Sequence, residues 1–561
     1  MRRNTQDLVR KEYDLVVIGG GIFGVCAAWD AAQRGLSVAL VEKKDFSHAT
    51  SAHHFKMVHG GIRYLQHADI YRVRESCRER SALLRIAPHL VKPLPVIIPT
   101  YGWGKKGKGV LGAGMLLYDL LTLDRNRAIT DPVRQIPRGR FLTRGELLDI
   151  FPGVETEGLT GGALFCDGQM YNPPRLALSF LRAAADAGAD AANYLEVTHF
   201  LRKERRVTGV GVRDNLTGEA FEIRGKVILN AAGPWAAPVV EKCLGVGLST
   251  APVFSRDACF VVRRSLSETY ALACQTRSRD ADAVLNRGGR HLFLIPWRGF
   301  TLVGVWHVVH RGEPETFTVS ERELQSFLDE TNETYPAISL TLDDVTVVNA
   351  GLILFEENEQ DSNGIHFGKR SILWDHEKIH GVEGLVTLIG VRATTARGMA
   401  GKAVDLVFRK LGKRSPKPRT ETTPIHGGRI DSFEEFLSGA IRHRPEGLDE
   451  EVIRSLVHNH GSGYGEVLKT LEGNAARTER VGTAPVIQAE VVHAVREEMA
   501  MKLGDVVFRR TDLGTGDYPG EDALRSCADL MASELGWKET RVEQEMDDVR
   551  GTFLHQSRDG Y

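Results

Sequence analysis

The clearest pattern of hydrophobic and polar positions lies near the N-terminus of the chain. Residues 15–18 form a short apolar run, residues 25–34 repeat apolar positions with helical spacing, and residues 36–41 form a second apolar run. Glycines separate these three segments, and Glu42 directly follows the last of them. Short apolar runs bounded by glycine predict buried strands, so this order predicts a strand–helix–strand unit with parallel strands.

The first glycine turn of this unit has the spacing of a dinucleotide-binding motif. Gly19, Gly21 and Gly24 form G-x-G-x-x-G between the first strand and the helix. In such a motif the first glycine permits a tight turn, the second lets the backbone approach a pyrophosphate, and the third allows close helix–strand packing. Glu42 is placed to accept hydrogen bonds from the adenosine ribose, and it would repel a 2′-phosphate, which argues against NADP.

Two later segments with small residues favour FAD over NAD. After the second strand the chain reads ATSAHHFKMVHGGIRYL, where an NAD domain would usually continue directly into another strand–helix unit. Farther on, the apolar segment KVILNAAGPW ends in small residues. Both turns suit a backbone that passes close to a flat ring system. The FAD contacts predicted from these segments are Ser51, His59, Gly60, Ala232 and Gly233. For His59, and for its neighbour His54, a purely structural role is the alternative.

Composition narrows the class of protein. The chain has 561 residues, 42% of them hydrophobic, and a formal net charge of −1, so it lacks the basic excess of nucleic-acid-binding proteins. Its seven cysteines include no Cys-x-x-Cys pair, which fits a reducing compartment and argues against disulfides or structural zinc. The N-terminus lacks the apolar stretch of a signal peptide, and no apolar run is long enough to span a bilayer. We therefore expect a cytoplasmic protein with no metal ion and no nucleic-acid partner.

Several stretches together resemble one known family. The FAD-linked glycerol-3-phosphate dehydrogenases, within the D-amino-acid oxidase superfamily, are similar in DLVVIGGGIFG, ATSAHHFKMVHGGIRYLQH, NAAGPW, FLIPWRGFTLVG, ATTARGMAGKAVD and AEVVHAVREEMAMKLGDVVFRRTDLG. The resemblance implies an α/β fold with a Rossmann-like FAD-binding domain, an antiparallel-sheet substrate domain and a helical C-terminal domain. The expected boundaries are 1–80, 180–240 and 346–412 for the first domain, 81–179 and 241–345 for the second, 413–430 for a linker and 431–561 for the third.

The resemblance also implies a reaction and a second set of flavin contacts. The expected activity is oxidation of glycerol 3-phosphate, or a close polyol phosphate, by hydride transfer to flavin N5, with electrons passed to quinone or another acceptor. In LIGVRATTARG a helix N-terminus would face the flavin, with Arg392 and Arg397 adding positive charge. Solvent-facing positions are the alternative for both arginines. The contacts implied by this segment are Gly390, Ala393, Thr394 and Thr395.

At the substrate site this sequence diverges from the family. Arg63 and Tyr64 match the family segment HGGIRYL, but Ile353 stands where an arginine is usual, and Arg392 replaces a lysine. His307 falls in GVWH, where the family has GTTD, and its alternative is simple packing beside Trp306. The catalytic residues predicted from this comparison are Arg63, Tyr64, His307 and Arg392, and the substrate-binding positions are Ile353, Lys369 and Arg370.

These departures leave two other functions open. The first is an FAD oxidoreductase of a different small hydroxy or amino substrate, with His307 as its base. The second is a flavoprotein without catalysis that serves as a binding module, although the retained Arg63 and Tyr64 argue against it.

One segment carries a membrane signal. Trp103, Lys105, Lys106 and Lys108 precede an apolar helix near 109–121, which is the composition of an interfacial anchor. The stripe of Leu111, Met115, Tyr118 and Leu121 equally fits a core or homodimer contact. Peripheral attachment to the inner face of a membrane therefore stays an alternative beside a cytoplasmic location.

Overall fold

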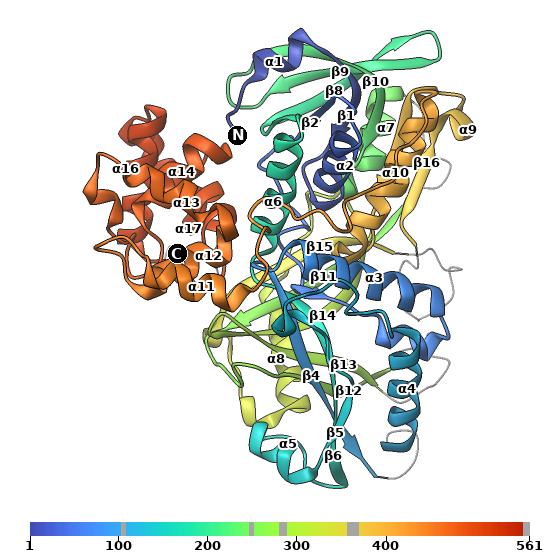
Figure 1. The fold of residues 1–561 in the computed structure, drawn as a ribbon, viewed down its shortest axis with the longest axis vertical. Helices are drawn as coiled ribbons and strands as arrows, with labels where there is room; N and C mark the ends of the chain where they lie inside the picture. The colour runs from blue at the N-terminus through green and yellow to red at the C-terminus, as the bar shows by residue number, and fades with distance from the viewer. Residues whose placement is uncertain (103–107, 246–251, 280–288, 356–369, 554–561) are drawn as a thin grey trace.

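The chain folds into two β-sheets and a separate group of helices (Figure 1). The structure is a computed structural model and describes residues 1–102, 108–245, 252–279, 289–355 and 370–553. In Figure 1 the first sheet lies at the top, the second at the bottom, and the C-terminal helices, in orange and red, lie beside them.

The first sheet contains eight strands of the described chain. Its central strands run parallel, and β1 lies between β10 and β2 as the predicted strand–helix–strand unit requires. The edge strand β16 and the β8–β9 hairpin add antiparallel pairs. The strands are β1 (Glu12–Ile18), β2 (Val38–Val41), β7 (Asp190–Ala192), β8 (Leu195–Lys203), β9 (Arg206–Asp214), β10 (Ala220–Asn230), β16 (Ile372–Asp375) and β17 (Leu385–Ile389).

Both faces of this sheet are covered by helices. Leu15 and Val17 of β1 pack in the cluster that holds α2 (Ile22–Gln33), α6 (Pro173–Asp186) and α10 (Ala396–Lys410). Val16 and Ile18 point to the opposite face, where α7 (Ala236–Leu244) packs. Alternate residues of a strand face opposite ways, so burial on both sides explains why β1 reads as a continuous apolar run.

The second sheet contains nine strands of the described chain, and they pair antiparallel except for β12 with β4. The strands are β3 (Met57–Val58), β4 (Val91–Tyr101), β5 (Arg140–Leu142), β6 (Leu159–Met170), β11 (Val253–Val262), β12 (Ala271–Arg279), β13 (Gly289–Trp297), β14 (Phe300–His310) and β15 (Val345–Phe355). Helix α8 (Glu321–Thr334) packs on one face, where Trp306 stacks on Phe260 and Phe327.

The chain passes between the two sheets more often than the expected boundaries suggest. Strands β3 and β15 fall within segments expected for the FAD-binding domain, yet both pair in the second sheet. Helix α6 starts in the expected substrate segment but packs on α2 of the first sheet. The domain boundaries themselves stay a prediction.

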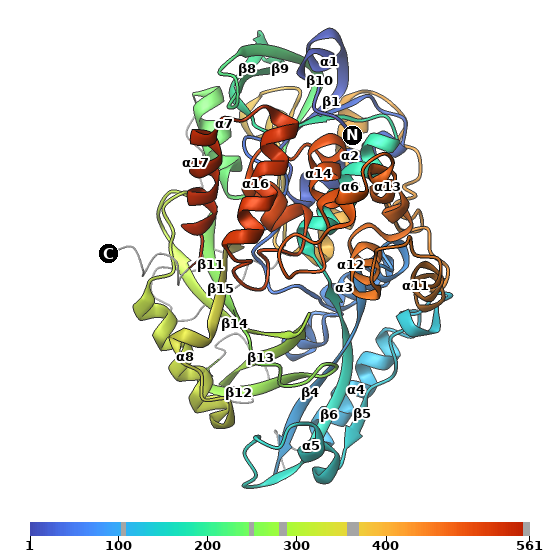
Figure 2. The same ribbon diagram turned by 90° about the vertical axis from the view of Figure 1, so that its left-hand side faces the viewer.

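The C-terminal part of the described chain is helical and packs beside α6 (Figure 2). Residues 413–430, expected as a linker, contain no helix or strand. The helices are α11 (Phe433–Arg442), α12 (Glu450–His460), α13 (Tyr464–Leu468), α14 (Gln488–Glu498), α15 (Leu503–Asp505), α16 (Glu521–Leu535) and α17 (Glu539–Arg550). With two sheets of the expected kinds and a helical C-terminal part, the predicted fold class is confirmed.

Helix α4 (Lys108–Leu121) has two apolar faces. Of the predicted stripe, Met115 and Tyr118 are buried, and the Tyr118 hydroxyl donates a hydrogen bond to the carbonyl of Gly60. The second face is exposed and consists of Leu116, Leu117 and Leu120, followed by Leu123 just beyond the helix. Trp103, Lys105 and Lys106 lie outside the described residues. In the described ranges, no helix is both long enough and apolar enough to cross a membrane.

Candidate functional site

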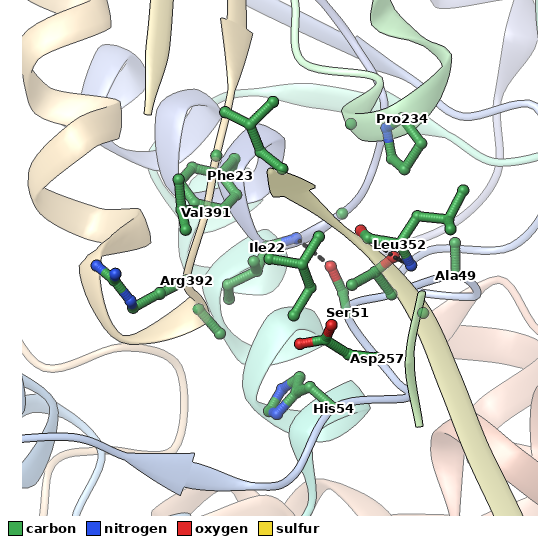
Figure 3. A pocket seen from close by; sticks show the side chains of 18 of the residues that line it. Ile22, Phe23, Ala49, Ser51, His54, Pro234, Asp257, Leu352, Val391 and Arg392 are labelled. Carbon is green, nitrogen blue, oxygen red and sulfur yellow. Dashed lines mark hydrogen bonds between the residues drawn. The ribbon is translucent and has the colours of Figure 1, made fainter. Parts of the chain in front are cut away.

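A cavity of about 1010 Å³ lies where the two sheets meet (Figure 3). The first sheet contributes the turns that follow β1, β2, β10 and β17, and the second sheet contributes residues of β11, β14 and β15. Turns at the carboxyl ends of parallel strands are the usual place for a bound cofactor in an open α/β sheet. The cavity is large enough for a dinucleotide.

The glycine turn after β1 forms one end of this cavity. Gly19 has φ +103°, and a Cβ on Gly24 would lie 1.9 Å from the Gly19 carbonyl oxygen. Gly21 is the N-cap of α2 and offers no capping side chain, while the backbone N–H of Ile22 donates to the Ser51 hydroxyl at 2.9 Å. Gly19, Gly21 and Ser51 line the cavity, and Gly24 lies behind them. The first turn of α2 therefore presents backbone N–H groups to an anion such as pyrophosphate.

Glu42 lies beside this turn with both carboxylate oxygens oriented. It accepts hydrogen bonds from the backbone N–H of Gly20 at 2.7 Å and of Lys44 at 3.0 Å. Burial raises the pKa of Glu42, although these two hydrogen bonds act in the opposite direction. Each carboxylate oxygen keeps a second lone pair, so Glu42 fits the ribose hydroxyls of a dinucleotide.

The ends of β10 and β17 form the middle of the cavity. Ala232 and Gly233 follow β10 and line it, as predicted. Gly390, which follows β17, also lines it, and a Cβ on Gly390 would lie 1.8 Å from the ring of Phe23. Gly390 thus leaves the space in which the Phe23 ring packs. A larger residue at this position would force the Phe23 ring to move, which explains the glycine at the end of the strand.

The turn before α10 brings some of its predicted contacts to the cavity and not others. Ala393 and Thr394 line it, and the Thr394 hydroxyl accepts a hydrogen bond from the backbone N–H of His59 at 3.2 Å. Thr395 does not line it, because its hydroxyl turns back to donate to the carbonyl of Arg392. Arg397 is buried in an ion pair with Glu79, so the expected positive charge beside the flavin comes from Arg392 alone of the two arginines.

The Gly-Gly turn meets the cavity through Gly61, whereas Gly60 is the position that was predicted to contact FAD. Gly61, with φ +84°, lines the cavity together with His59. Gly60 faces away, since a Cβ there would lie 2.0 Å from a guanidinium nitrogen of Arg80. The backbone N–H of Gly60 donates to Asp167, which also pairs with Arg80. Gly60 therefore holds the turn against α3 (Ile70–Ile86), and its predicted FAD contact stays a prediction.

Positive charge collects around Tyr64 at the other end of the cavity. The guanidinium carbons of Arg72 and Arg392 lie 4.7 and 4.8 Å from the centre of its ring. Arg72 is paired with Asp69, whereas no carboxylate of the described residues lies within ion-pair distance of Arg392. Burial lowers the pKa of Arg392, and the charge of Arg72 acts in the same direction. Arg63 lines the cavity close by. An uncompensated guanidinium in a cavity favours an anionic ligand.

His307 faces the cavity from β14, opposite Asp257 of β11. The His307 Nδ1 atom lies 2.7 Å from an Asp257 carboxylate oxygen, and the Ser255 hydroxyl donates to the same oxygen. Trp306 points to the other face of the strand, into the core beside α8. The alternative in which His307 packs beside Trp306 is therefore not what the structure shows.

Ile353 also lines the cavity and brings no charge to it. Thr50 ties its strand to the first sheet, because the Thr50 hydroxyl accepts from the backbone N–H of Leu352 and lies within hydrogen-bond distance of the Leu352 carbonyl. Arg370 is exposed and is not among the lining residues, and Lys369 lies outside the described residues.

Asp257 lines the cavity and was not predicted from the sequence. It ends the polar run Ser255–Asp257 between apolar residues of β11, and this run was its signal. His54, left open between two roles, lies next to Asp257 in Figure 3. Its Nδ1 accepts a hydrogen bond from the backbone N–H of Lys56, and burial lowers the pKa of His54 to about 3. Arg392 lies on the other side of the cavity in the same view.

A second group of polar side chains lies between α6 and the C-terminal helices. His460, His493 and Glu498 are buried with their ligand atoms within 4.8 Å of one another. Arg175 contacts Glu498 at 2.6 Å and His460 at 2.9 Å, and Arg182 contacts Glu498 at 3.1 Å and His493 at 3.2 Å. Arg175 and Arg182 thus pair with all three of these side chains.

Comparisons with known proteins agree with this geometry. Residues 14–400 match the family described as FAD dependent oxidoreductase, and residues 418–542 match the C-terminal domain of alpha-glycerophosphate oxidase. A glycerol-3-phosphate dehydrogenase of Synechocystis sp. is 32% identical over 550 residues, covering 97% of each chain. An aerobic glycerol-3-phosphate dehydrogenase of Staphylococcus aureus is 30% identical over 565 residues, covering 97% of this chain and 95% of the relative.

A solved structure extends the similarity to the arrangement of elements. The glycerol-3-phosphate dehydrogenase from Bacillus halodurans, complexed with FAD, matches with a TM-score of 0.76 and 25% identity. The match covers 97% of this chain and 95% of the other. An L-proline dehydrogenase from P. horikoshii shares the fold, with a TM-score of 0.52 and 16% identity.

Proposed function

The chain belongs to the family of FAD-dependent oxidoreductases, and we propose that it oxidises glycerol 3-phosphate or a close polyol phosphate. Full-length relatives that bear the name glycerol-3-phosphate dehydrogenase support the proposal. The observation that carries it is Arg392, whose guanidinium lies at the cavity with no carboxylate partner in the described part of the chain. A phosphate monoester would supply the missing negative charge.

FAD fits the observed cavity. Gly21, Ile22 and Ser51 would hold the pyrophosphate at the start of α2, and Glu42 would bind the adenosine ribose. Ala393 and Thr394 would lie along the flavin, where the N-terminus of α10 favours negative charge. The chemistry that FAD supplies when bound is acceptance of a hydride from the carbon that bears the hydroxyl group.

The residues at the substrate end divide the remaining work. Arg392, with Arg63 and Tyr64, would bind the phosphate and orient the substrate. Since Nδ1 of His307 faces Asp257, its Nε2 would take the hydroxyl proton as the hydride leaves. Asp257 would stabilise the imidazolium that forms. Arg392 cannot serve as the base, because a guanidinium does not give up its proton near neutral pH.

A second candidate is a small hydroxy or amino substrate with less negative charge. Ile353 adds no positive charge to the cavity, and Asp257 adds a negative one. The substitution Ile353→Arg separates the two candidates. If glycerol 3-phosphate is the substrate, Arg392 already binds its phosphate, and kcat/KM should change by less than about threefold. A gain above about tenfold, worth ~1.4 kcal/mol, would show that selectivity has moved to another compound.

For the electron acceptor we infer a quinone reached at a membrane surface. The exposed leucine face of α4 supports this, since Leu116 is 63% exposed, Leu120 is 58% exposed and Leu123 is 69% exposed. Lys105 and Lys106 precede the helix and suit anionic lipid headgroups. The protein would then work in the cytoplasm, attached to the inner face of the membrane. The alternative is that the same leucines form a homodimer interface.

Anaerobic reduction of the purified yellow protein tests the reaction. Glycerol 3-phosphate should bleach the flavin absorbance within one turnover, and glycerol at the same concentration should not. Bleaching by an unphosphorylated alcohol or an amine, without bleaching by glycerol 3-phosphate, would favour the second candidate. A protein that binds FAD but is reduced by none of these compounds would be consistent with the non-catalytic alternative.

A further inference from the structure

One loop of the cavity is held by the C-terminal helices. The loop after β2 contains Asp45, and the residues from Ser47 to Ser51 that follow line the cavity. Ser51 accepts the hydrogen bond from the backbone N–H of Ile22 at the start of α2, where the pyrophosphate of FAD fits. The position of this loop therefore sets the shape of the cofactor end of the cavity.

Asp45 is the anchor of the loop. It is 1% exposed, and its carboxylate accepts four hydrogen bonds. Arg509 donates one at 2.6 Å, Arg510 donates two at 2.7 and 2.8 Å, and Asn193 donates one at 2.9 Å. Burial alone would raise the pKa of Asp45, but Arg510 and Arg509 outweigh it and hold the pKa below its ordinary value. Three of the four donors thus come from the C-terminal part of the chain.

Both arginines are also held by other residues of the C-terminal helices. They end a short π-helix, Val506–Arg510, an uncommon element that is frequent at functional sites. Arg510 also donates two hydrogen bonds to the carbonyl of Glu498, at 3.1 and 2.9 Å. Arg509 also pairs with Asp505 at 2.6 Å. The two guanidinium groups are therefore already oriented toward Asp45.

The charge of Arg509 also reaches the cavity wall. His48 lines the cavity, and its pKa is lowered to about 3, first by burial and then by the charge of Arg509. His48 is thus kept neutral in the loop that FAD would contact. Removal of the C-terminal helices would take both guanidinium groups away from Asp45 and leave the Asn193 amide as its donor, so the loop would lose the contacts that fix it.

We propose that Asp45 is a positioning residue that couples FAD binding to the docking of the C-terminal helices. The docked helices hold the loop in its binding conformation, and FAD in turn stabilises the docked helices. Coupling of this kind is reciprocal, so each event must favour the other by the same factor. The proposal depends on FAD binding and is independent of the identity of the substrate.

Amide hydrogen exchange of the unaltered protein, with and without FAD, tests one direction of the coupling. FAD should slow exchange in residues 503–512, which include Arg509 and Arg510, at least several-fold more than in α11, which packs on α12 elsewhere in the same group of helices. Equal exchange in residues 503–512 with and without FAD would overturn the proposal. No substrate is present, so the outcome does not depend on the proposed reaction.

Two substitutions test the other direction. Asp45→Asn should weaken FAD binding by at least about tenfold, measured as the Kd for FAD by fluorescence titration of the apoprotein. Arg509→Gln, which leaves the Arg510 pair in place, should weaken it by a smaller factor and decides the question if Asp45→Asn does not fold. Arg496→Gln is the matched control, because Arg496 makes a two-bond pair with Glu534 within the C-terminal helices and does not touch the loop.

The control also separates coupling from simple loss of stability. We expect Arg496→Gln to lower the melting temperature of the apoprotein while changing the Kd for FAD by less than about twofold. Asp45→Asn and Arg509→Gln should change both, and they should abolish or reduce the slowing of exchange in residues 503–512 by FAD. A Kd within twofold of the unaltered protein for both folded variants would overturn the proposal.

Discussion

The cofactor end and the substrate end of the cavity are formed by different kinds of groups. At the cofactor end, beside the side chains of Ser51 and Glu42, the site depends on backbone groups and on glycines packed against backbone, as at Gly19 and Gly24. At the substrate end the contacts are side chains, namely Arg392 and His307. A glycine packed against backbone cannot be replaced without moving a strand or helix, whereas a side chain that lines a cavity can change while the fold stays the same.

This difference explains how a chain can keep its cofactor and alter its substrate. The fingerprint of FAD binding is intact around Gly19 and Glu42, while Ile353, His307 and Arg392 depart from the residues usual in the resembling family. We therefore propose that selectivity rests on a few side chains on strands β14 and β15 and on the turn before α10. The predictions below test this division, beginning with the largest expected effect.

Substitution of Gly24 by alanine should have the largest effect. The added Cβ would lie 1.9 Å from the Gly19 carbonyl oxygen, so α2 must move away from β1. We expect a destabilisation of ~3 kcal/mol or more and purification without FAD, measured by thermal unfolding and flavin absorbance. Gly439→Ala in α11 is the control, because no atom lies within 4 Å of its Cβ position. A yellow, stable Gly24→Ala protein would contradict the backbone-built cofactor end.

Substitution of His307 by asparagine should spare the cofactor and impair the reaction. Loss of a general base typically lowers kcat by ~10²–10⁴, and the FAD content should stay at that of the unaltered protein. Asp257→Asn should lower kcat less, since it removes the group that orients His307 and leaves the imidazole in place. Rapid anaerobic reduction of the flavin measures both. An unchanged rate of reduction in His307→Asn would show that another residue takes the proton.

Substitution of Arg392 by glutamine should act mainly on binding. Loss of one partner of a buried, hydrogen-bonded charge pair typically costs ~2–5 kcal/mol, so kcat/KM for glycerol 3-phosphate should fall by a factor of ~10². Most of this loss should appear as a higher KM, and Arg392→Lys should restore part of it because it returns the charge without the planar fork.

The matched control for Arg392 is a substrate without phosphate. Any slow reduction by glycerol itself should be the same in Arg392→Gln as in the unaltered protein. An equal loss with glycerol and with glycerol 3-phosphate would mean that Arg392 acts on the reacting carbon or on the flavin, and not on the phosphate.

The exposed face of α4 should affect neither end of the cavity. The double substitution Leu116→Glu and Leu120→Glu should abolish flotation with phosphatidylglycerol vesicles and leave activity with a soluble acceptor within about twofold, because burial of apolar side chains drives interfacial binding. Ile379→Glu, on the equally exposed Ile379 of α9 (His376–His380), is the control. Undiminished flotation would exclude α4 as the anchor. A dimer that the double substitution converts to monomers would assign this face to self-association.

The sequence predicts the cofactor end well because its determinants are local. The turn Gly19–Gly24, the acid Glu42 and the small residues after β10 are each recognisable from their neighbours along the chain. Register of strand pairing is not local, and Asp257 meets His307 only because β11 and β14 pair antiparallel with these residues opposite each other. For the same reason the sequence did not show that β3 and β15 pair in the second sheet or that Arg397 pairs with Glu79.

The order of strands has a consequence for the synthesis of the protein. Glu12 of β1 pairs with Arg224 of β10, 212 positions later (224 − 12), and β10 in turn pairs with β17 at Leu385. The first sheet cannot be completed until nearly 390 residues have left the ribosome, which takes on the order of 20–80 s at roughly 5–20 residues per second. Until β10 has emerged, the apolar strand β1 has an open edge that invites aggregation. We therefore expect a nascent chain that depends on chaperones, whereas the contiguous C-terminal helices can form last and quickly.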